Sequence, residues 1–105
     1  MSLDVSLYNP DEIYEDNITH NLNTMAENAG IYMHLWRPEE IGITTAGQLI
    51  DPLEAGLCRL LEDPDHFKQF DASNGWGKYK HLVAFVSGYL VACKENPDAT
   101  VYVSR

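Results

Sequence analysis

The sequence has few basic residues and no long hydrophobic run. Lysine and arginine number 7 against 16 aspartate and glutamate residues, and the net charge is −9 at pH 7. This balance argues against binding to nucleic acid or to an anionic membrane, because both reward clustered positive charge. No segment approaches the roughly 18 apolar residues of a transmembrane helix, and the N-terminal region lacks the apolar stretch of a signal peptide. We therefore expect a cytoplasmic protein that binds neither nucleic acid nor membrane.

Motifs that carry chemistry are also absent. The sequence has no phosphate-binding glycine loop, no Gly-x-Ser-x-Gly nucleophile motif and no Cys-x-x-Cys pair. None of the four histidines has the spacing of a metal ligand pair: His20, His34, His66 and His81. The two cysteines, Cys58 and Cys93, fall in apolar helical stretches and are expected to be buried, reduced thiols. We predict no metal site and no cofactor.

Length and hydrophobic pattern predict one domain over residues 1–105. Residues 3–8 alternate apolar and polar, and residues 100–103 are rich in β-branched side chains, so both segments are expected to be strands. An isolated strand cannot satisfy its backbone, so these two should pair. The predicted fold is α+β and mostly α, with about four helices packed around a central C-terminal helix and a short two-stranded sheet.

The first helix is predicted from a capping pattern. Asn9 is a good N-cap, Pro10 suits the first helical position, and Glu12 can return a hydrogen bond to the cap. The helix would run to Ala29 and end before Gly30. A break near residues 16–17 is an open alternative, because asparagine is a weak helix former.

Three further helical segments follow. A short helix or a tight crossing segment is expected within residues 31–37. A longer helical region begins at Thr44 or Thr45, and its main helix is expected to start at Asp51. One apolar stripe marks that helix: Leu49, Ile50, Leu53, Leu57, Leu60 and Leu61. Residues 78–95 form the strongest helical pattern, and because they are apolar on most sides they are placed at the centre of the core.

Polar residues line one side of the first predicted helix. Asn17, Asn21, Thr24 and Asn28 align beside its apolar stripe, and His20 lies one step further round. Amides both donate and accept hydrogen bonds, so such an edge suits a polar ligand or the backbone of a partner. The alternative is a solvated helix boundary whose amides cap neighbouring loops.

Two other clusters combine aromatic and polar groups. Arg37, between Trp36 and Pro38, can bind an anionic ligand or form an ion pair inside the protein. Trp36 itself is expected in or beside the core. The loop that holds Asn74 and Trp76 has glycines that allow a sharp bend, and its indole is either a plug under the last helix or a stacking wall for a ligand.

Taken together, these segments resemble a family of small uncharacterised proteins of bacteria and their phages. The resemblance rests on residues 17–22, 35–41 and 74–77 with Tyr79, and on the terminal Ser104-Arg105. It extends over nearly the whole chain. It implies a stand-alone cytosolic protein of mobile-element origin and carries over no catalytic residue.

Three functional hypotheses follow. The first is a non-enzymatic binding module whose clusters converge on a groove for a small polar or anionic ligand: Asn17, His20, Asn21, Thr24, Trp36, Arg37, Asn74 and Trp76. The second is an acidic interaction or inhibitor protein that uses exposed tyrosines to bind a basic protein partner. The third is a small hydrolase or transferase in which Asp16 orients His20 as a base. Unpaired sheet edges also favour a homodimer.

Overall fold

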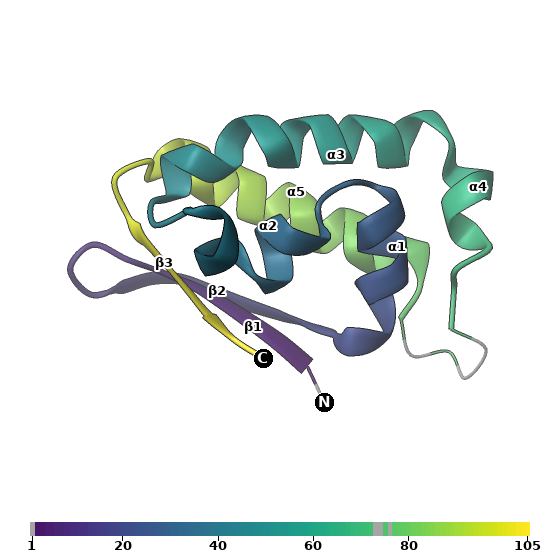
Figure 1. Cartoon of the computed structure of the whole chain (residues 1–105), viewed down its shortest axis with the longest axis horizontal. Coiled ribbons are helices and arrows are strands. Elements are labelled where there is room, and N and C mark those ends of the chain that lie inside the picture. The colour runs from purple at the N-terminus through teal and green to yellow at the C-terminus, as the bar shows by residue number, and fades with distance from the viewer. Residues whose placement is uncertain (1, 73–74, 76) are drawn as a thin grey trace.

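A computed structural model describes residues 2–72, 75 and 77–105. These residues form three strands, five α-helices and three short 3-10 helices (Figure 1). The strands are β1 (Ser2–Tyr8), β2 (Glu12–Thr19) and β3 (Thr100–Ser104). The α-helices are α1 (Asn23–Asn28), α2 (Tyr32–Trp36), α3 (Ile50–Glu62), α4 (Pro64–Lys68) and α5 (Tyr79–Glu95). The 3-10 helices are η1 (His20–Leu22), η2 (Pro38–Ile41) and η3 (Ala46–Leu49).

The strands form an antiparallel sheet in the order β2-β1-β3, and the helices lie on one side of it (Figure 1). Val5 of β1 lies opposite Val103 of β3, which confirms the predicted pairing of the first and last strands. The α+β class is also confirmed. The sheet nevertheless has three strands rather than two, and the described part of the chain has five α-helices rather than about four.

The third strand replaces the first half of the helix predicted from residue 10. A cis peptide bond joins Asn9 to Pro10, and the chain turns there to bring β2 back along β1. Tyr14, Asp16 and Ile18 are more buried than their neighbours in β2, which is the two-residue period of a strand. A capping pattern stabilises only the first turn of a helix. Pairing with β1 instead gives the backbone groups along β2 hydrogen-bond partners. Neither the single helix to Ala29 nor the helix broken near residues 16–17 is correct.

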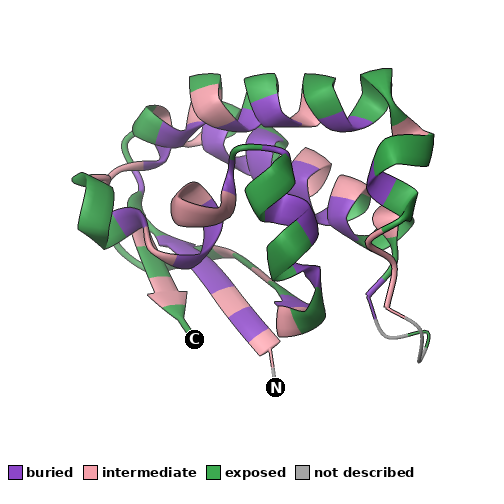
Figure 2. Ribbon diagram, turned by 45° about the vertical axis from the view of Figure 1, so that its right-hand side comes forward, coloured by how far each residue is buried: buried purple, intermediate pink, exposed green. Residues whose placement is uncertain are grey.

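The core lies between the sheet and the helices. Leu3, Val5 and Leu7 point from β1 into it and are fully buried, and the bands of burial along this strand are visible in Figure 2. On the other side α5 packs against α3, α4, η3 and β2. Leu82, Val86 and Tyr89 of α5 are completely buried. The nearly all-round apolar character of this helix is explained by its neighbours on several sides.

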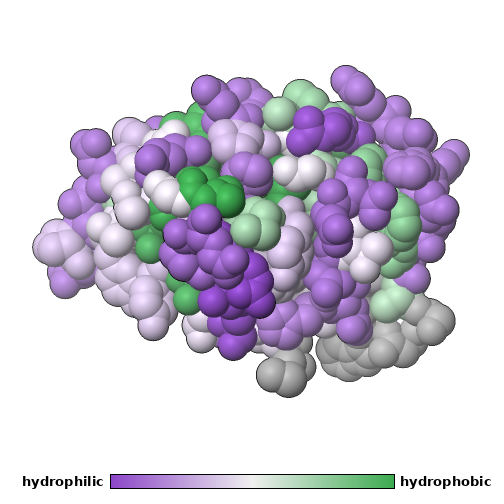
Figure 3. Space-filling view, viewed as in Figure 1, coloured by the Kyte–Doolittle hydropathy of each residue, from purple (hydrophilic) through white to green (hydrophobic). Residues whose placement is uncertain are grey.

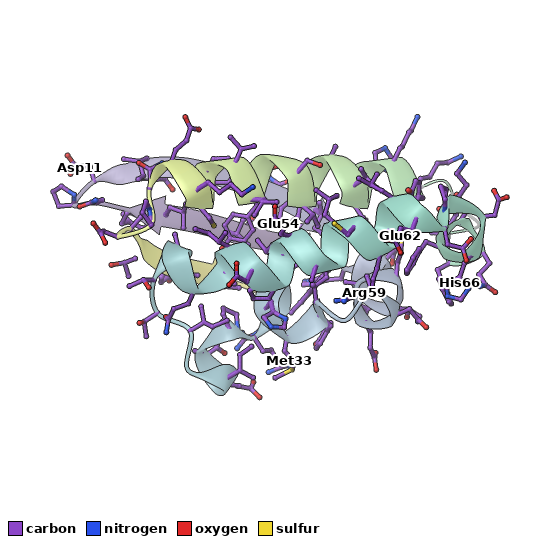
Figure 4. All side chains as sticks on the ribbon, turned by 90° about the horizontal axis from the view of Figure 1, so that it is seen from above. Asp11, Met33, Glu54, Arg59, Glu62 and His66 are labelled. Atoms are coloured by element: carbon purple, nitrogen blue, oxygen red, sulfur yellow. The ribbon has the colours of Figure 1, made fainter. Side chains whose placement is uncertain are left out.

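The junction between α1 and α2 is held by α3. Gly30 follows α1 with a φ angle of +78°, in the conformation predicted for a residue that ends a helix. Arg59 of α3 donates a hydrogen bond from Nε to the carbonyl oxygen of Ala29 at 2.7 Å. Figure 4 shows Arg59 on the side of α3 that faces α1. The guanidinium thereby satisfies a carbonyl that the end of α1 leaves without a helical partner.

Four predicted burials have different outcomes. Trp36 is 3% exposed, as expected for a core residue, and Cys93 is buried, which raises the pKa of its thiol to about 12. The prediction was wrong for Cys58, which is exposed on α3. Leu61 is 55% exposed and does not belong to the buried stripe of that helix. Only one side of α3 contacts the core, because the helix lies on the surface of the helical layer.

Candidate functional site

A pocket of about 810 Å³ lies where β2, η1 and α5 meet the loop before α5. We call it the amide pocket, because Asn17 and Asn21 both line it. Its other polar lining groups include Asp16, Thr19 and His81, and its apolar lining comprises Ile18, Leu22, Ala84 and Phe85. Ser2, Gly75 and Gly77 complete the lining among the described residues. The pocket therefore joins hydrogen-bonding groups to an apolar wall, the usual composition of a small-molecule site.

The transition from β2 to η1 sets the positions of the two asparagines. Thr19 has extended backbone angles, and its Oγ1 accepts a hydrogen bond from the backbone N–H of Asn21 at 3.3 Å. This side-chain cap starts the 3-10 turn directly after the strand. The change of backbone geometry places Asn17, at the end of a strand, and Asn21, in the following turn, around the same pocket.

The loop before α5 packs closely onto this turn at Gly77. A Cβ atom at this position would lie 3.1 Å from Cγ2 of Thr19 and 3.2 Å from Cβ of Asn21. Its φ angle of +108° is also one that residues other than glycine rarely adopt. Glycine is therefore required both by the backbone angle and by the short approach, which brings this loop against the asparagine side of the pocket.

Asp16 is the acidic group of the amide pocket. Its Oδ1 accepts the backbone N–H of Asn17 at 2.8 Å, so the carboxylate is oriented by its own strand. Burial and, second, the negative charge of Asp16 raise the pKa of Tyr14 to about 12. The Tyr14 hydroxyl is therefore a neutral group beside a carboxylate at physiological pH.

His81 faces the same pocket from the first turn of α5. Its Nδ1 accepts the backbone N–H of Lys78 at 3.1 Å, which supplies a partner to the start of the helix. With Nδ1 acting as an acceptor, the neutral ring carries its proton on Nε2 and can donate a hydrogen bond from there. The pocket thus contains a carboxylate acceptor, amide groups and an imidazole.

Three other predicted site residues form a separate network. Trp36 donates from Nε1 to Nδ1 of His20 at 2.9 Å, and its ring stacks on Tyr32 at 5.4 Å between centroids. The Tyr32 hydroxyl accepts a hydrogen bond from Nε of Arg37 at 3.4 Å, and Arg37 forms an ion pair with Glu40 at 2.7 Å. The internal ion pair weighed for Arg37 is therefore present. None of His20, Trp36 and Arg37 lines the amide pocket.

The remaining predicted residues are distributed as follows. Thr24 lies in α1, away from the pocket lining, and its hydroxyl donates to Oδ1 of Asn23 at 3.3 Å. The single stripe predicted for residues 17–28 is wrong, because Asn17 belongs to a strand. The helical alignment of Asp16 with His20 fails for the same reason. Asn74 and Trp76 lie outside the described residues.

Asp16 was predicted only as a partner of His20, and His81 and Phe85 were not among the predicted site residues. The only available signal was that His81 and Phe85 are four positions apart in a predicted helix and so share a face. Nothing in the sequence indicates that this face meets the end of β2. In the described part of the chain, no group of three histidine, cysteine or acidic residues is arranged to hold a metal ion.

Comparisons with known proteins complete the description of the site. A scan against family models, a search of curated proteins and a search of solved structures each found no match. Within residues 2–72, 75 and 77–105, none of the helices has the length and apolar character needed to cross a membrane.

Proposed function

We propose that this protein is a non-enzymatic binding module that holds a small polar ligand in the amide pocket. The observation that carries the proposal is the convergence of Asn17 and Asn21 with His81 and Phe85, which come from three different elements, around one volume of about 810 Å³. Side-chain amides can form hydrogen bonds with hydroxyl, amide and amine groups, because each amide has donors and an acceptor.

The charge of the lining narrows the class of ligand. Asp16 is the only acidic residue among the described lining residues, and no lysine or arginine is among them. Arg37, which motivated an anionic ligand, is instead engaged with Tyr32 and Glu40. A buried anion would meet a carboxylate without a permanent positive charge to balance it. These features support a ligand that is neutral or carries one positive charge, with an apolar part that packs on Phe85.

A hydrolase or transferase based on His20 has weaker support. Its Nδ1 is the acceptor for the buried indole of Trp36, and its ring is not part of the pocket lining. A general base needs to reach the proton that it abstracts from a bound substrate. With its Nδ1 held by an internal partner, His20 serves the structure of the η1–α2 contact.

The proposal is tested by a ligand screen monitored by NMR of the ¹⁵N-labelled protein. The compounds are nucleosides, monosaccharides, amino-acid amides and polyamines, so that neutral and singly or multiply cationic molecules are all represented. We expect a binding compound to shift the backbone amide signals of Asn17, Asn21 and His81. Compounds that bind elsewhere would shift other signals.

Two matched variants provide the control. Ala84→Met extends a side chain from an exposed helical position in the pocket lining, and Ala55→Met makes the same change at an exposed position of α3 outside it. Ligand binding should weaken at least about tenfold in the first variant, because the added side chain occupies the ligand's volume, and should be unchanged in the second. Equal affinity in both variants, or no binding by any compound class, would exclude the amide pocket as the binding site.

A further inference from the structure

The face of the sheet that points away from the helices is a second surface with a distinct chemistry. Side chains alternate along a strand, and Leu3, Val5 and Leu7 point into the core, so Asp4, Ser6 and Tyr8 point the other way. Residues opposite one another in neighbouring strands share a face. We call this surface the outer sheet face. It also contains Glu12 and Glu15 of β2 and Tyr102 of β3.

Two tyrosines form the centre of the outer sheet face. Tyr8 and Tyr102 are 36% and 59% exposed, and their rings meet edge to face with centroids 6.3 Å apart. The hydroxyl of Tyr8 also donates to Oε1 of Glu12 at 3.5 Å. Each ring is thus held by a neighbour while much of its surface stays in solvent. Exposed tyrosines whose rings are already fixed are favoured at protein interfaces, because each offers a large contact area and loses little conformational entropy on binding.

The charge around these rings has one sign. The three strands contain four acidic residues and neither lysine nor arginine, and three of the acids, Asp4, Glu12 and Glu15, belong to the outer sheet face. Arg105 follows β3, but its Nη1 is bonded to Glu39 at 2.9 Å and to the carbonyl oxygen of Trp36 at 2.7 Å. Arg105 therefore balances the charge of Glu39 in η2 and not the negative charge of the sheet.

We propose that the outer sheet face binds an arginine-rich segment of a partner protein. Guanidinium groups stack on tyrosine rings and form bidentate hydrogen bonds with carboxylates, so the pairing of exposed tyrosines with Glu12 and Glu15 suits arginine on both counts. The net charge of −9 would also draw a basic segment toward the protein over a longer range. A second copy of this chain fits less well, because two such faces would place like charges opposite each other. Asn17, opposite Asp4, also belongs to this face and adjoins the amide pocket, whereas Tyr8 and Tyr102 lie outside the pocket lining.

The test is a titration of the ¹⁵N-labelled protein with a synthetic peptide of alternating arginine and serine, with an alternating glutamate and serine peptide as the reference. We expect the arginine peptide to shift amide signals of β1, β2 and β3 around Tyr8 and Tyr102, and the glutamate peptide to shift none. Tyr102→Ala should weaken binding about threefold or more, whereas Tyr102→Phe should retain it, since the ring and not the hydroxyl makes the contact. Circular dichroism verifies that each variant is folded.

A charge-matched pair of variants separates a local site from the effect of net charge. Glu12→Gln with Glu15→Gln removes two charges from the outer sheet face, and Glu27→Gln with Glu62→Gln removes two from exposed positions on α1 and α3. Figure 4 shows Glu62 on α3, far from Asp11 at the tip of the β1–β2 hairpin. Only the first pair should weaken binding, and the loss should diminish as salt rises.

Three results would overturn the proposal. The first is an equal loss of affinity in both charge-matched pairs, which would indicate attraction by net charge alone. The second is a set of shifted signals that lies outside the outer sheet face, or no shift with millimolar peptide. The third is self-association of the free protein that Tyr102→Ala abolishes, because the occupant of this face would then be a second copy of the chain.

Discussion

The indole of Trp36 and the imidazole of His20 are joined across sixteen positions of the chain by a hydrogen bond of 2.9 Å from Nε1 to Nδ1. Trp36 is almost fully buried, so its N–H needs an acceptor within the protein. The bond connects the first residue of η1 to the last residue of α2. A histidine that the sequence places on a polar helix edge therefore acts as the acceptor for a core side chain.

Replacing His20 with phenylalanine should destabilise the fold. The change leaves the buried Trp36 N–H without its acceptor, and such a loss costs about 1–3 kcal/mol. The loss in the free energy of unfolding is measured by urea unfolding of the wild type, His20→Phe, Trp36→Phe and the double variant. The double-mutant cycle should give a coupling of about 1 kcal/mol. Additive effects of the two single changes would mean that the bond contributes nothing to stability.

Gly56→Ala should be strongly destabilising although alanine favours helices. A Cβ atom at this position in α3 would overlap with Cγ2 of Ile31, a fully buried β-branched side chain. Overpacking of this kind costs about 1–3 kcal/mol, which exceeds the gain of about 1 kcal/mol from removing a helical glycine. Thermal and urea unfolding would detect a lower stability.

Gly88→Ala in α5 is the matched control. Its added Cβ would lie 3.2 Å from the hydroxyl of Tyr14, which ends a side chain of only intermediate burial. This contact can be relieved by a small shift, so Gly88→Ala should be close to neutral or slightly stabilising. Equal losses at the two positions would contradict the packing argument.

Tyr89→Phe should stabilise the protein. Tyr89 is completely buried, and within the described part of the chain its hydroxyl has no hydrogen-bond partner. Burial raises its pKa, so the hydroxyl stays neutral, but its lost hydration is not replaced. Removing it should increase the free energy of unfolding by about 1 kcal/mol. The comparison is Tyr14→Phe, at a ring that stacks on Tyr89 with centroids 5.9 Å apart and keeps more exposure. A decrease in stability for Tyr89→Phe would reveal a buried water or another acceptor.

Mild acid should destabilise the protein through His34. Burial and, second, the positive charge of Arg59 lower the pKa of His34 below its usual value of 6.5. Above that value the ring is neutral in both the folded and the unfolded state and has no effect. As the pH falls below 6.5, His34 takes up a proton first in the unfolded chain. The free energy of unfolding therefore decreases until the pH passes the lower pKa of the folded state.

The measurement compares His34→Gln with His66→Gln. His66 is exposed in α4, so the second variant is a control for the loss of a histidine. Urea unfolding at about pH 7.5 and about pH 5.5 should show a smaller decrease for His34→Gln than for the wild type, and an unchanged decrease for His66→Gln. The same pH dependence in all three proteins would assign it to other groups.

Much of the remaining surface is polar. Polar side chains cover most of the face seen in Figure 3, with small hydrophobic areas between them. Lys94 of α5 bridges to Glu54 of α3 at 3.2 Å, and both side chains are about half exposed. Surface ion pairs of this kind contribute little to stability. Ala55 and Glu62 are exposed on α3 and lie outside both the amide-pocket lining and the outer sheet face, so control substitutions can be made there.

Elements with a strong local signal were predicted well. The apolar pattern of residues 78–95 corresponds to α5, and the predicted strands at both ends of the chain correspond to β1 and β3. Gly30 ends α1 as expected, because its left-handed conformation is a property of glycine itself. The segment 10–19 was predicted wrongly, since its polar residues and Asn-Pro start fit a capped helix locally and its strand conformation depends on pairing with β1.

Only part of the candidate site could be predicted from the sequence. Asn17 and Asn21 were selected for their amides, and both line the amide pocket. Arg37, selected for its charge, is satisfied within its own turn by Glu40. Asp16 was predicted in another role, and His81 and Phe85 were not predicted, because these three residues come together only when β2 and α5 are packed against each other.

By itself, the sequence determined the α+β class, the central apolar helix, the pairing of the terminal strands and the acidic character of the surface. These follow from composition, hydrophobic period and the conformational preferences of single residues. The tertiary structure alone decided that residues 12–19 form an edge strand, that the amide pocket and the His20–Trp36 network are separate, and that two tyrosines meet on an acidic sheet face. The reason is physical: backbone pairing and side-chain contact between distant segments have energies that no local pattern contains.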